Sequence, residues 1–177
     1  LRVLQTAPAL QRVAFECAED LHLGSNVTYC EIRYCPTLHL AEGLKPQEAV
    51  AAVGAGLRQA MAAYPGMVCN QIITCLRDFG PEDAVQNVKL AIAVRASSPE
   101  CRVVGVDLAG NEFAHPPEGF TDAFDLAAAA GLGITIHAGE GSSEQAVANV
   151  RNSVKLLHAN RIGHGVAARR DPELMDE

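Results

Sequence analysis

Basic residues are scarce in this sequence, which has 14 lysines and arginines against 21 aspartates and glutamates and a formal net charge of -7. Surfaces that bind nucleic acids or anionic membranes need clustered lysine and arginine, so we expect neither partner. Long apolar runs are also lacking: two glycines interrupt the nearest candidate, residues 126–136, and a membrane-spanning helix needs ~18 apolar residues or more. These absences predict a soluble protein, and they leave small uncharged or cationic ligands as compatible partners.

Sequence patterns that bind phosphates or pair cysteines are absent as well. Neither G-x-G-x-x-G nor G-x-x-x-x-G-K-[ST] occurs, so a dinucleotide or P-loop nucleotide site lacks its phosphate cradle. The six cysteines form no C-x-x-C pair and no zinc-finger spacing. We interpret them as buried free thiols, with disulfides as the weaker alternative. This interpretation predicts a reducing, cytoplasmic location.

The apolar pattern alternates between strands and helices along the whole chain. Hydrophobic residues make up 49% of the sequence and charged residues 20%, which is an ordinary globular composition. Short β-branched runs predict strands, and runs with helical periodicity lie between them. The predicted strands are 27–33, 68–76, 102–108, 133–137 and 161–164, and the predicted helices are 46–64, 81–96, 119–130 and 143–159.

This alternation predicts an α/β fold, either a partial (β/α)8 TIM barrel or a doubly wound open sheet. Strand starts lie about 30 to 40 residues apart, close to the ~30 residues per unit of a barrel. Polar residues gather repeatedly just after strands, where the active sites of parallel barrels lie, and this favours the barrel. We expect residues 1–177 to form a single, incomplete barrel domain.

Both ends of the chain resemble interruptions of a longer sequence. The first residues lead directly into an amphipathic helical pattern without an initiator methionine. At the other end, Asp171 has the character of a helix N-cap and Pro172 that of a first helical residue. We therefore expect the chain to be an internal fragment of a larger protein.

His137-Ala138-Gly139-Glu140 is the strongest candidate for chemistry. It places an imidazole and a carboxylate three positions apart where an apolar strand gives way to a loop. Histidine is the commonest metal ligand and a nearby carboxylate can transfer protons, so the pair suits metal-assisted hydrolysis. The alternatives are a core histidine and a first-turn glutamate at the start of the next helix.

Two more strand ends carry similar groups. His164 lies between Gly163 and Gly165, which leave the imidazole uncrowded, although a tight turn that happens to contain histidine is the alternative. Adjacent parallel strands could bring His137 and His164 to one reacting group. In 107–112, Gly110 would expose a backbone N–H to a ligand, and Asp107 could orient a neighbour.

The remaining polar residues near these strand ends are weaker candidates. Asn111 and Glu112 are loop residues for which a solvated surface position is an equal alternative. The other histidines lie on predicted helices or loops without a partner at metal spacing, and we expect them at the surface: His22, His39, His115 and His158.

Together these segments resemble the adenosine deaminases, within the metal-dependent amidohydrolase-like (β/α)8 barrels. The resemblance rests on four segments in the family's order and nearly its spacing, and it extends from about Val13 to the end of the chain. They are Glu31-Ile32-Arg33-Tyr34-Cys35-Pro36, Asp107-Leu108-Ala109-Gly110-Asn111-Glu112, His137-Ala138-Gly139-Glu140 and Arg161-Ile162-Gly163-His164-Gly165. The resemblance implies that the chain covers about strands 2 to 6 of the barrel.

The family's functional residues can be carried over position by position. The resemblance implies that His137 binds the metal, that Glu140 donates a proton to N1 of the purine, and that His164 assists the attacking water. It also implies that the Gly110 N–H binds purine N3. The implied cofactor is one Zn²⁺ per complete site, and the implied reaction, in purine metabolism, is the hydrolytic deamination of adenosine, and of 2′-deoxyadenosine, to inosine and ammonia.

The chain also departs from the family pattern. The H-x-H ligands of the first strand and the paired aspartates of the last strand have no match, and Asn111 replaces an aspartate. Because catalytic zinc sites normally take three protein ligands, we expect no deaminase activity from these 177 residues alone. The alternatives are an adenine or modified-adenine-nucleotide deaminase of the same family, and a truncated, inactive binding product. The sequence leaves the oligomeric state open.

Overall fold

The computed structural model describes residues 3–176, and these fall into two compact units. Unit 1 comprises the described residues up to Ile73 together with Leu90–Val104. Unit 2 comprises Thr74–Lys89 and the described residues from Gly105 onward. The prediction of a single incomplete domain is not tested by this division and stays a prediction.

The elements alternate in the predicted order, with short 3-10 turns between several of them. The helices are α1 (Ala7–Ser25), α2 (Pro46–Ala63), α3 (Gly80–Ser97), α4 (Thr121–Ala129), α5 (Glu144–Leu157) and α6 (Pro172–Asp176). The strands are β1 (Tyr29–Tyr34), β2 (Val68–Leu76), β3 (Val103–Ala109), β4 (Gly133–Ala138) and β5 (Arg161–His164). Predicted strand boundaries agree with these to within two residues.

The strands form one sheet in the order β1-β2-β3-β4-β5. Within unit 1, β1 pairs in parallel with β2, and within unit 2, β4 pairs in parallel with both β3 and β5. The register places His137 opposite Gly163 and Ala138 opposite His164. Parallel strands joined by helices are the architecture of part of a (β/α)8 barrel, as the sequence predicted.

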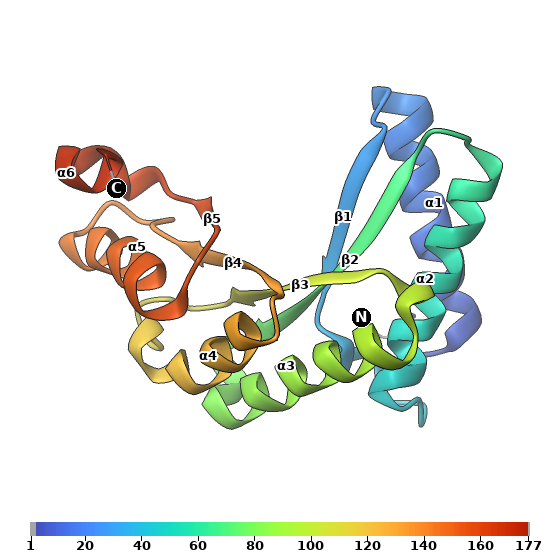
Figure 1. Ribbon diagram of the computed structural model, residues 1–177, viewed down its shortest axis with the longest axis horizontal. Helices are drawn as coiled ribbons and strands as arrows, with labels where there is room; N and C mark the ends of the chain where they lie inside the picture. Colours follow the sequence, from blue (N-terminus) through green and yellow to red (C-terminus); the bar gives the residue numbers. More distant parts are fainter. Residues whose placement is uncertain (1–2, 177) are drawn as a thin grey trace. The chain divides into compact units, whose positions relative to one another are not determined.

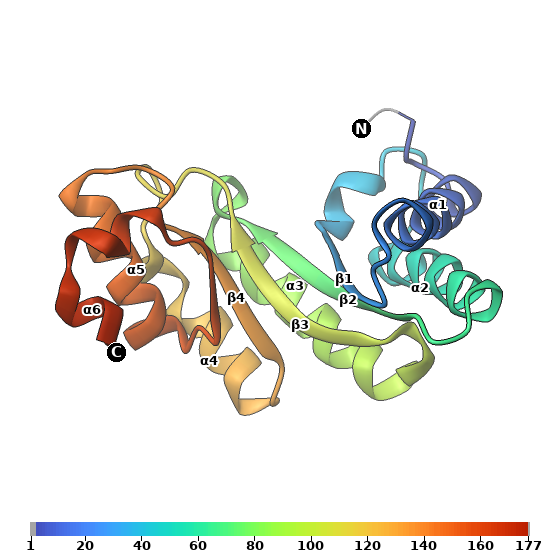
Figure 2. The same cartoon turned by 90° about the horizontal axis from the view of Figure 1, so that it is seen from above.

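Unit 1 is built on the close packing of α1 against α2, which lie side by side in both views (Figures 1 and 2). A Cβ at Gly56 would lie 2.2 Å from the backbone oxygen of Gln11, so only glycine permits this approach. Small residues such as Ala14 and Ala18 complete the contact.

Five of the six cysteines are buried and Cys17 is half-buried, which confirms the expected burial of the thiols.

In unit 2, α4 and α5 pack against β4. Ile134 and Ile136 of β4 are 2% and 0% exposed, and Phe124 of α4 is fully buried. Within α5, Val150 and Leu157 are buried together with the polar residues Asn149 and Ser153, whereas Val154 is exposed. The polar side chains can be buried because each has a partner: Ser153 Oγ donates to the Asn149 carbonyl at 2.7 Å, and Asn149 bonds to Glu112.

The cap of α6 agrees with its prediction, whereas the burial of His39 does not. Asp171 caps α6, since its Oδ1 accepts a hydrogen bond from Leu174 N at 3.1 Å, as predicted. The expectation that His39 lies at the surface is wrong. It is buried, and its ring Nδ1 lies 2.8 Å from the Leu4 carbonyl oxygen, which satisfies the ring inside unit 1.

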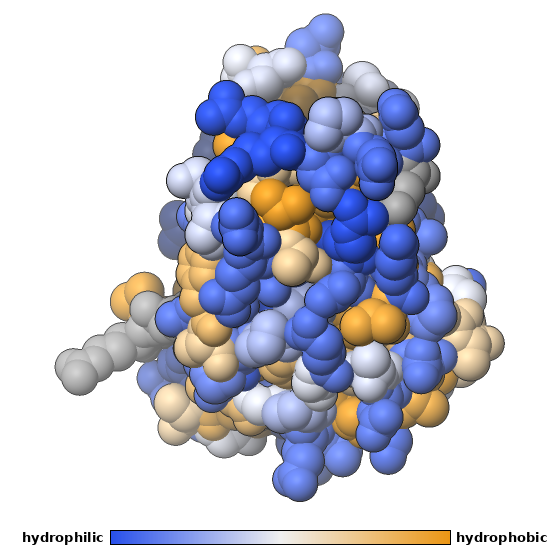
Figure 3. All heavy atoms as spheres, turned by 90° about the vertical axis from the view of Figure 1, so that its left-hand side faces the viewer, coloured by the Kyte–Doolittle hydropathy of each residue, from blue (hydrophilic) through white to orange (hydrophobic). Residues whose placement is uncertain are grey.

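Within residues 3–176, none of the helices is long and apolar enough to cross a membrane. The face drawn in Figure 3 is mostly hydrophilic, with apolar side chains in separate small patches.

Candidate functional site

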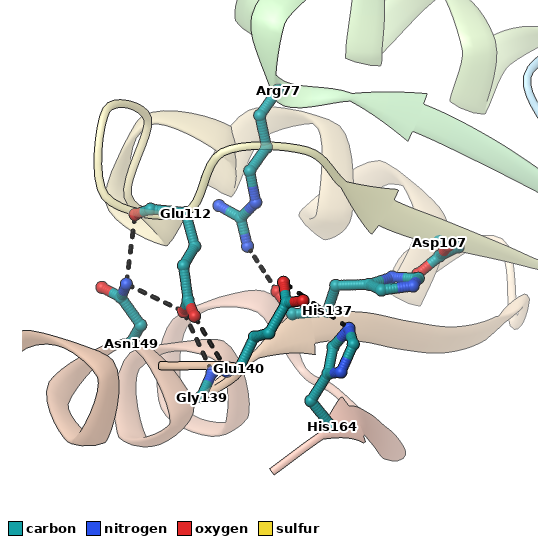
Figure 4. Close-up of polar contacts among 8 residues, drawn as sticks. All are labelled: Arg77, Asp107, Glu112, His137, Gly139, Glu140, Asn149 and His164. Atoms are coloured by element: carbon teal, nitrogen blue, oxygen red, sulfur yellow. Dashed lines mark hydrogen bonds and ion pairs between the residues drawn. The ribbon is translucent and has the colours of Figure 1, made fainter. Parts of the chain in front are cut away.

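The candidate site lies at the carboxyl ends of β3, β4 and β5, entirely within unit 2 (Figure 4). The ring Nδ1 of His137 lies 2.9 Å from Asp107 Oδ1. The Asp107 side chain is fully buried and that of His137 is 16% exposed. A carboxylate can only accept hydrogen bonds, so Nδ1 carries the proton and Nε2 keeps its lone pair for a cation or a proton.

His164 approaches the same ring from β5. The ring centroids of His137 and His164 are 5.4 Å apart and tilted by 59°. His164 has a left-handed backbone with φ +68°, which costs a non-glycine residue about 1–3 kcal/mol and is typical of functional sites. The two predicted histidines therefore converge, whereas a tight turn alone would not require their approach.

Glu140 completes this group. Its Oε2 lies 3.9 Å from His164 Nε2, and its side chain is 73% exposed. It does not belong to the first turn of the next helix, because α5 begins at Glu144 after its N-cap Ser143. The carboxyl group is therefore accessible to a ligand and close to the histidine pair.

Gly110 occupies a position that only glycine fits. Its φ is +109°, and a Cβ there would lie 2.5 Å from Asp78 Oδ2 and 3.4 Å from the backbone nitrogen of Arg77. The residue is exposed, in the loop that follows β3. The observed backbone thus agrees with the expectation of an accessible glycine at this strand end.

Arg77 is a residue that the sequence interpretation missed. It is fully buried, and its guanidinium donates to the carbonyl oxygens of His115 at 2.7 Å and His137 at 2.9 Å. Burial lowers the pKa of Arg77 to about 10, and the negative charges of Glu112 and Asp107 oppose that shift. Nothing in the pattern around Arg77 distinguishes it from an arginine at the end of an exposed strand.

Asn149 was also missed, and Glu112 was only a weak candidate with a surface alternative. Glu112 is 5% exposed, so the alternative of a solvated surface position is wrong. Its two carboxylate oxygens accept hydrogen bonds from the backbone nitrogens of Gly139 and Glu140, each at 3.0 Å. Asn149 Nδ2 donates to Glu112 Oε2 at 3.0 Å. A signal was present in the sequence, because Asn149 lies at helical spacing from the buried apolar residues Ala146 and Leu157 of α5.

The donor set fits a metal ion only in part. His137, with Nδ1 held by a buried carboxylate, has the arrangement common to metal-binding histidines. Catalytic zinc sites take three protein ligands, and residues 3–176 contain no group of three histidine, cysteine, aspartate or glutamate side chains placed to bind one ion. Among the described residues, His137 alone therefore has the setting of a metal ligand, and it would fill one of the three protein positions.

A family model described as "Adenosine deaminase" matches residues 1–177. The chain belongs to the adenosine deaminase family. Among curated proteins, the adenosine deaminase of Clostridium perfringens is 38% identical over 173 residues, covering 98% of this chain and 49% of that protein. The Clostridium acetobutylicum adenosine deaminase is 37% identical over 175 residues, covering 99% and 49%. The chain thus spans about half the length of these relatives.

Solved structures of related proteins share the fold. An amidohydrolase from Burkholderia ambifaria with bound Zn is 34% identical, with a TM-score of 0.88 over 98% of this chain and 46% of that one. Adenine deaminase from Arthrobacter aurescens is 25% identical, with a TM-score of 0.85 over 98% and 50%. The N6-mAMP deaminase of Arabidopsis is 26% identical, with a TM-score of 0.81 over 99% and 51%. These neighbours confirm the predicted partial barrel.

Proposed function

We propose that the protein hydrolyses adenosine, and 2′-deoxyadenosine, to inosine and ammonia with the help of one zinc ion. The observation that carries this proposal is the convergence of His137, His164 and Glu140, with the His137 ring oriented by Asp107. Family membership and the Zn-bound amidohydrolase neighbour support the same chemistry.

His137 is the proposed metal ligand in this chain, through Nε2. Asp107 would keep Nδ1 protonated and hold the ring in one orientation, as carboxylates commonly do behind ligating histidines. Zinc, when bound, supplies the Lewis acidity that lets water act as a nucleophile at neutral pH.

Glu140 and His164 are the proposed proton-transfer groups. Glu140, protonated, would donate to N1 of the purine ring, which makes C6 more electrophilic and prepares it for water. His164 would accept or orient the proton of that water, and protons passed on through Glu140 would help ammonia leave C6. The distance of 3.9 Å between Glu140 Oε2 and His164 Nε2 supports this proposal, because both groups could then act on one purine ring.

Gly110 is the proposed contact to the purine ring. Its exposed backbone, with no Cβ, would let the N–H donate to purine N3. A small-molecule purine is therefore the proposed partner. The free thiols, five of them buried, support a reducing, cytoplasmic location as part of the same proposal.

The neighbours favour one alternative substrate class. Two of them are named as acting on adenine and on N6-methyl-AMP, so the protein, as its gene encodes it, should be assayed on adenosine, 2′-deoxyadenosine, adenine and AMP. The proposal predicts that both nucleosides have the largest kcat/KM and that a chelator abolishes turnover until zinc is restored. A preference for adenine or AMP would contradict the substrate assignment. The inactivity of the 177 residues alone stays a prediction.

A further inference from the structure

The Glu140 side chain has little that fixes it directly. It is 73% exposed, and its contact with His164 is 3.9 Å, longer than a hydrogen bond. Its carboxyl group can therefore reach a ligand reproducibly only if the backbone that carries it is fixed. The structure shows how the backbone is held.

Glu112 binds that backbone through its carboxylate. One carboxylate oxygen accepts the N–H of Gly139 and the other accepts the N–H of Glu140, both at 3.0 Å (Figure 4). Hydrogen bonds to a charged acceptor are roughly twice as strong as those between neutral groups. Two successive amides are thus directed at one buried carboxylate.

We call the two hydrogen bonds from Gly139 and Glu140 to the Glu112 carboxylate the clamp. Other residues hold this carboxylate in place and balance its charge. Asn149 of α5 donates from Nδ2 to the Glu112 carboxylate at 3.0 Å and to its backbone oxygen at 3.1 Å. The buried Arg77 provides positive charge, and Glu112 is the largest electrostatic influence that raises the pKa of that guanidinium. Arg77 also bonds the His137 carbonyl, so the same network contacts both ends of the segment 137–140, which runs from the end of β4 into the following loop.

Other residues also contact the backbone on either side of Glu140. Gly139 has φ +72°, a Cβ there would lie 2.5 Å from Val150 Cγ2, and its carbonyl accepts from Ala167 N at 3.1 Å. The ring of Phe113, the residue after Glu112, lies 2.7 Å from where a Cβ of Gly141 would be. Residues 112 and 113 therefore confine the loop on both sides of Glu140.

We propose that Glu112 is a positioning residue, whose carboxylate fixes the Gly139–Glu140 backbone and so sets where the Glu140 carboxyl meets the purine. This inference rests on the proposed function of Glu140, while the clamp itself can be measured without it. Glu112 does not touch the reacting atoms, so its loss should reduce kcat and leave KM nearly unchanged.

The test uses Glu112→Gln in the protein as its gene encodes it, with Glu118→Gln as the matched control. Glu118 also accepts a hydrogen bond from an asparagine of α5, Asn152, but it is exposed, and its charge influences Arg77 less than that of Glu112 does. Glutamine keeps one acceptor oxygen for one of the two backbone amides. Its NH₂ group would face the other backbone N–H, and no hydrogen bond can form between two donors. We expect kcat on adenosine to fall about 10- to 100-fold and KM to change less than about threefold, with Glu118→Gln at the wild-type level.

Amide hydrogen exchange provides the readout that is independent of activity. In Glu112→Gln the amides of Gly139 and Glu140 should exchange about tenfold faster, while the α5 amides keep their wild-type rates. Glu112→Asp, which keeps both oxygens on a shorter arm, should fall between wild type and Gln in kcat and exchange. If Glu112→Gln does not fold, the kcat and the exchange rates of Glu112→Asp test the proposal instead.

Two results would overturn the proposal. One is an unchanged kcat and unchanged exchange at Gly139 and Glu140. The other is a uniform acceleration of exchange across unit 2 with kcat lost only in proportion to folded protein, which would show a general stabilising role. If the wild type deaminates none of the purines, the proposed function fails and the exchange rates alone decide whether the clamp exists.

Discussion

The two units bury different kinds of polar groups. In unit 1 the buried polar side chains are three amides and one histidine: Gln5, Asn70, Gln71 and His39. Unit 2 contains every buried side chain of residues 3–176 that carries a formal charge, namely Arg77, Asp107 and Glu112. Gln71 shows what a neutral group does in unit 1, since it accepts from the Tyr34 hydroxyl and donates to the Val50 and Cys101 carbonyls. It ties neighbouring elements together.

This difference separates a structural network from a functional one. Buried charges are expensive, and replacing them with well-packed apolar residues is often neutral or stabilising. Stability alone therefore gives unit 2 little reason to bury three of them. All three bond to His137 or to the Glu140 backbone, so these buried charges hold the two residues that the proposed function uses.

The largest expected effect on stability comes from breaking the charged network. Arg77→Met leaves Asp107 and Glu112 buried without their cation, which should lower the free energy of unfolding by about 3–5 kcal/mol. Gln71→Leu in unit 1 is the neutral counterpart and should cost about 1–3 kcal/mol, because its partners lose hydrogen bonds. Urea unfolding of both variants checks this order. Equal costs would remove the distinction between the units.

Alkaline pH should have a smaller effect, and the buried thiols of unit 1 should contribute to it. Burial raises the pKa of the Cys30 thiol from 9.0 to about 12, and it also raises the pKa values of Cys17, Cys69 and Cys101. Because the folded pKa lies above the unfolded one, the stabilisation is complete below pH 9 and is lost as pH rises toward 12.

Unfolding midpoints measured at intervals between pH 8 and 11 test this expectation. Cys30→Ala should show a shallower loss of stability over that range than the wild type. An identical pH dependence in the two proteins would show that the Cys30 thiol makes no contribution.

The fold could be predicted because its signals are local. Apolar runs and glycine or proline at the junctions determine where strands and helices begin, and β2 and β5 were predicted with their observed bounds, Val68–Leu76 and Arg161–His164. The grouping of His137, Glu140 and His164, the proposed ligand-facing residues, could also be predicted, because each lies at the end of a strand in a recognisable motif.

The buried residues that hold those groups in place could not be predicted, because their role depends on contacts between residues far apart in the sequence. Glu112 and Asn149 are 37 residues apart, and Arg77 and His137 are 60 apart. A glutamate after a strand and an arginine after another have ordinary surface interpretations until those partners are known. Only the position of Asn149 on the inward face of α5 indicated a buried polar contact.

The most direct test of the account compares Glu140→Gln with Glu144→Gln in the deamination of adenosine. Both glutamates are exposed and lie four positions apart, but only Glu140 approaches His164. The account predicts that Glu140→Gln lowers kcat by about 10²–10⁴-fold, the contribution of a general acid, with an unchanged unfolding midpoint, and that Glu144→Gln retains wild-type turnover. Wild-type kcat in Glu140→Gln, or an equal loss in both variants, would contradict it.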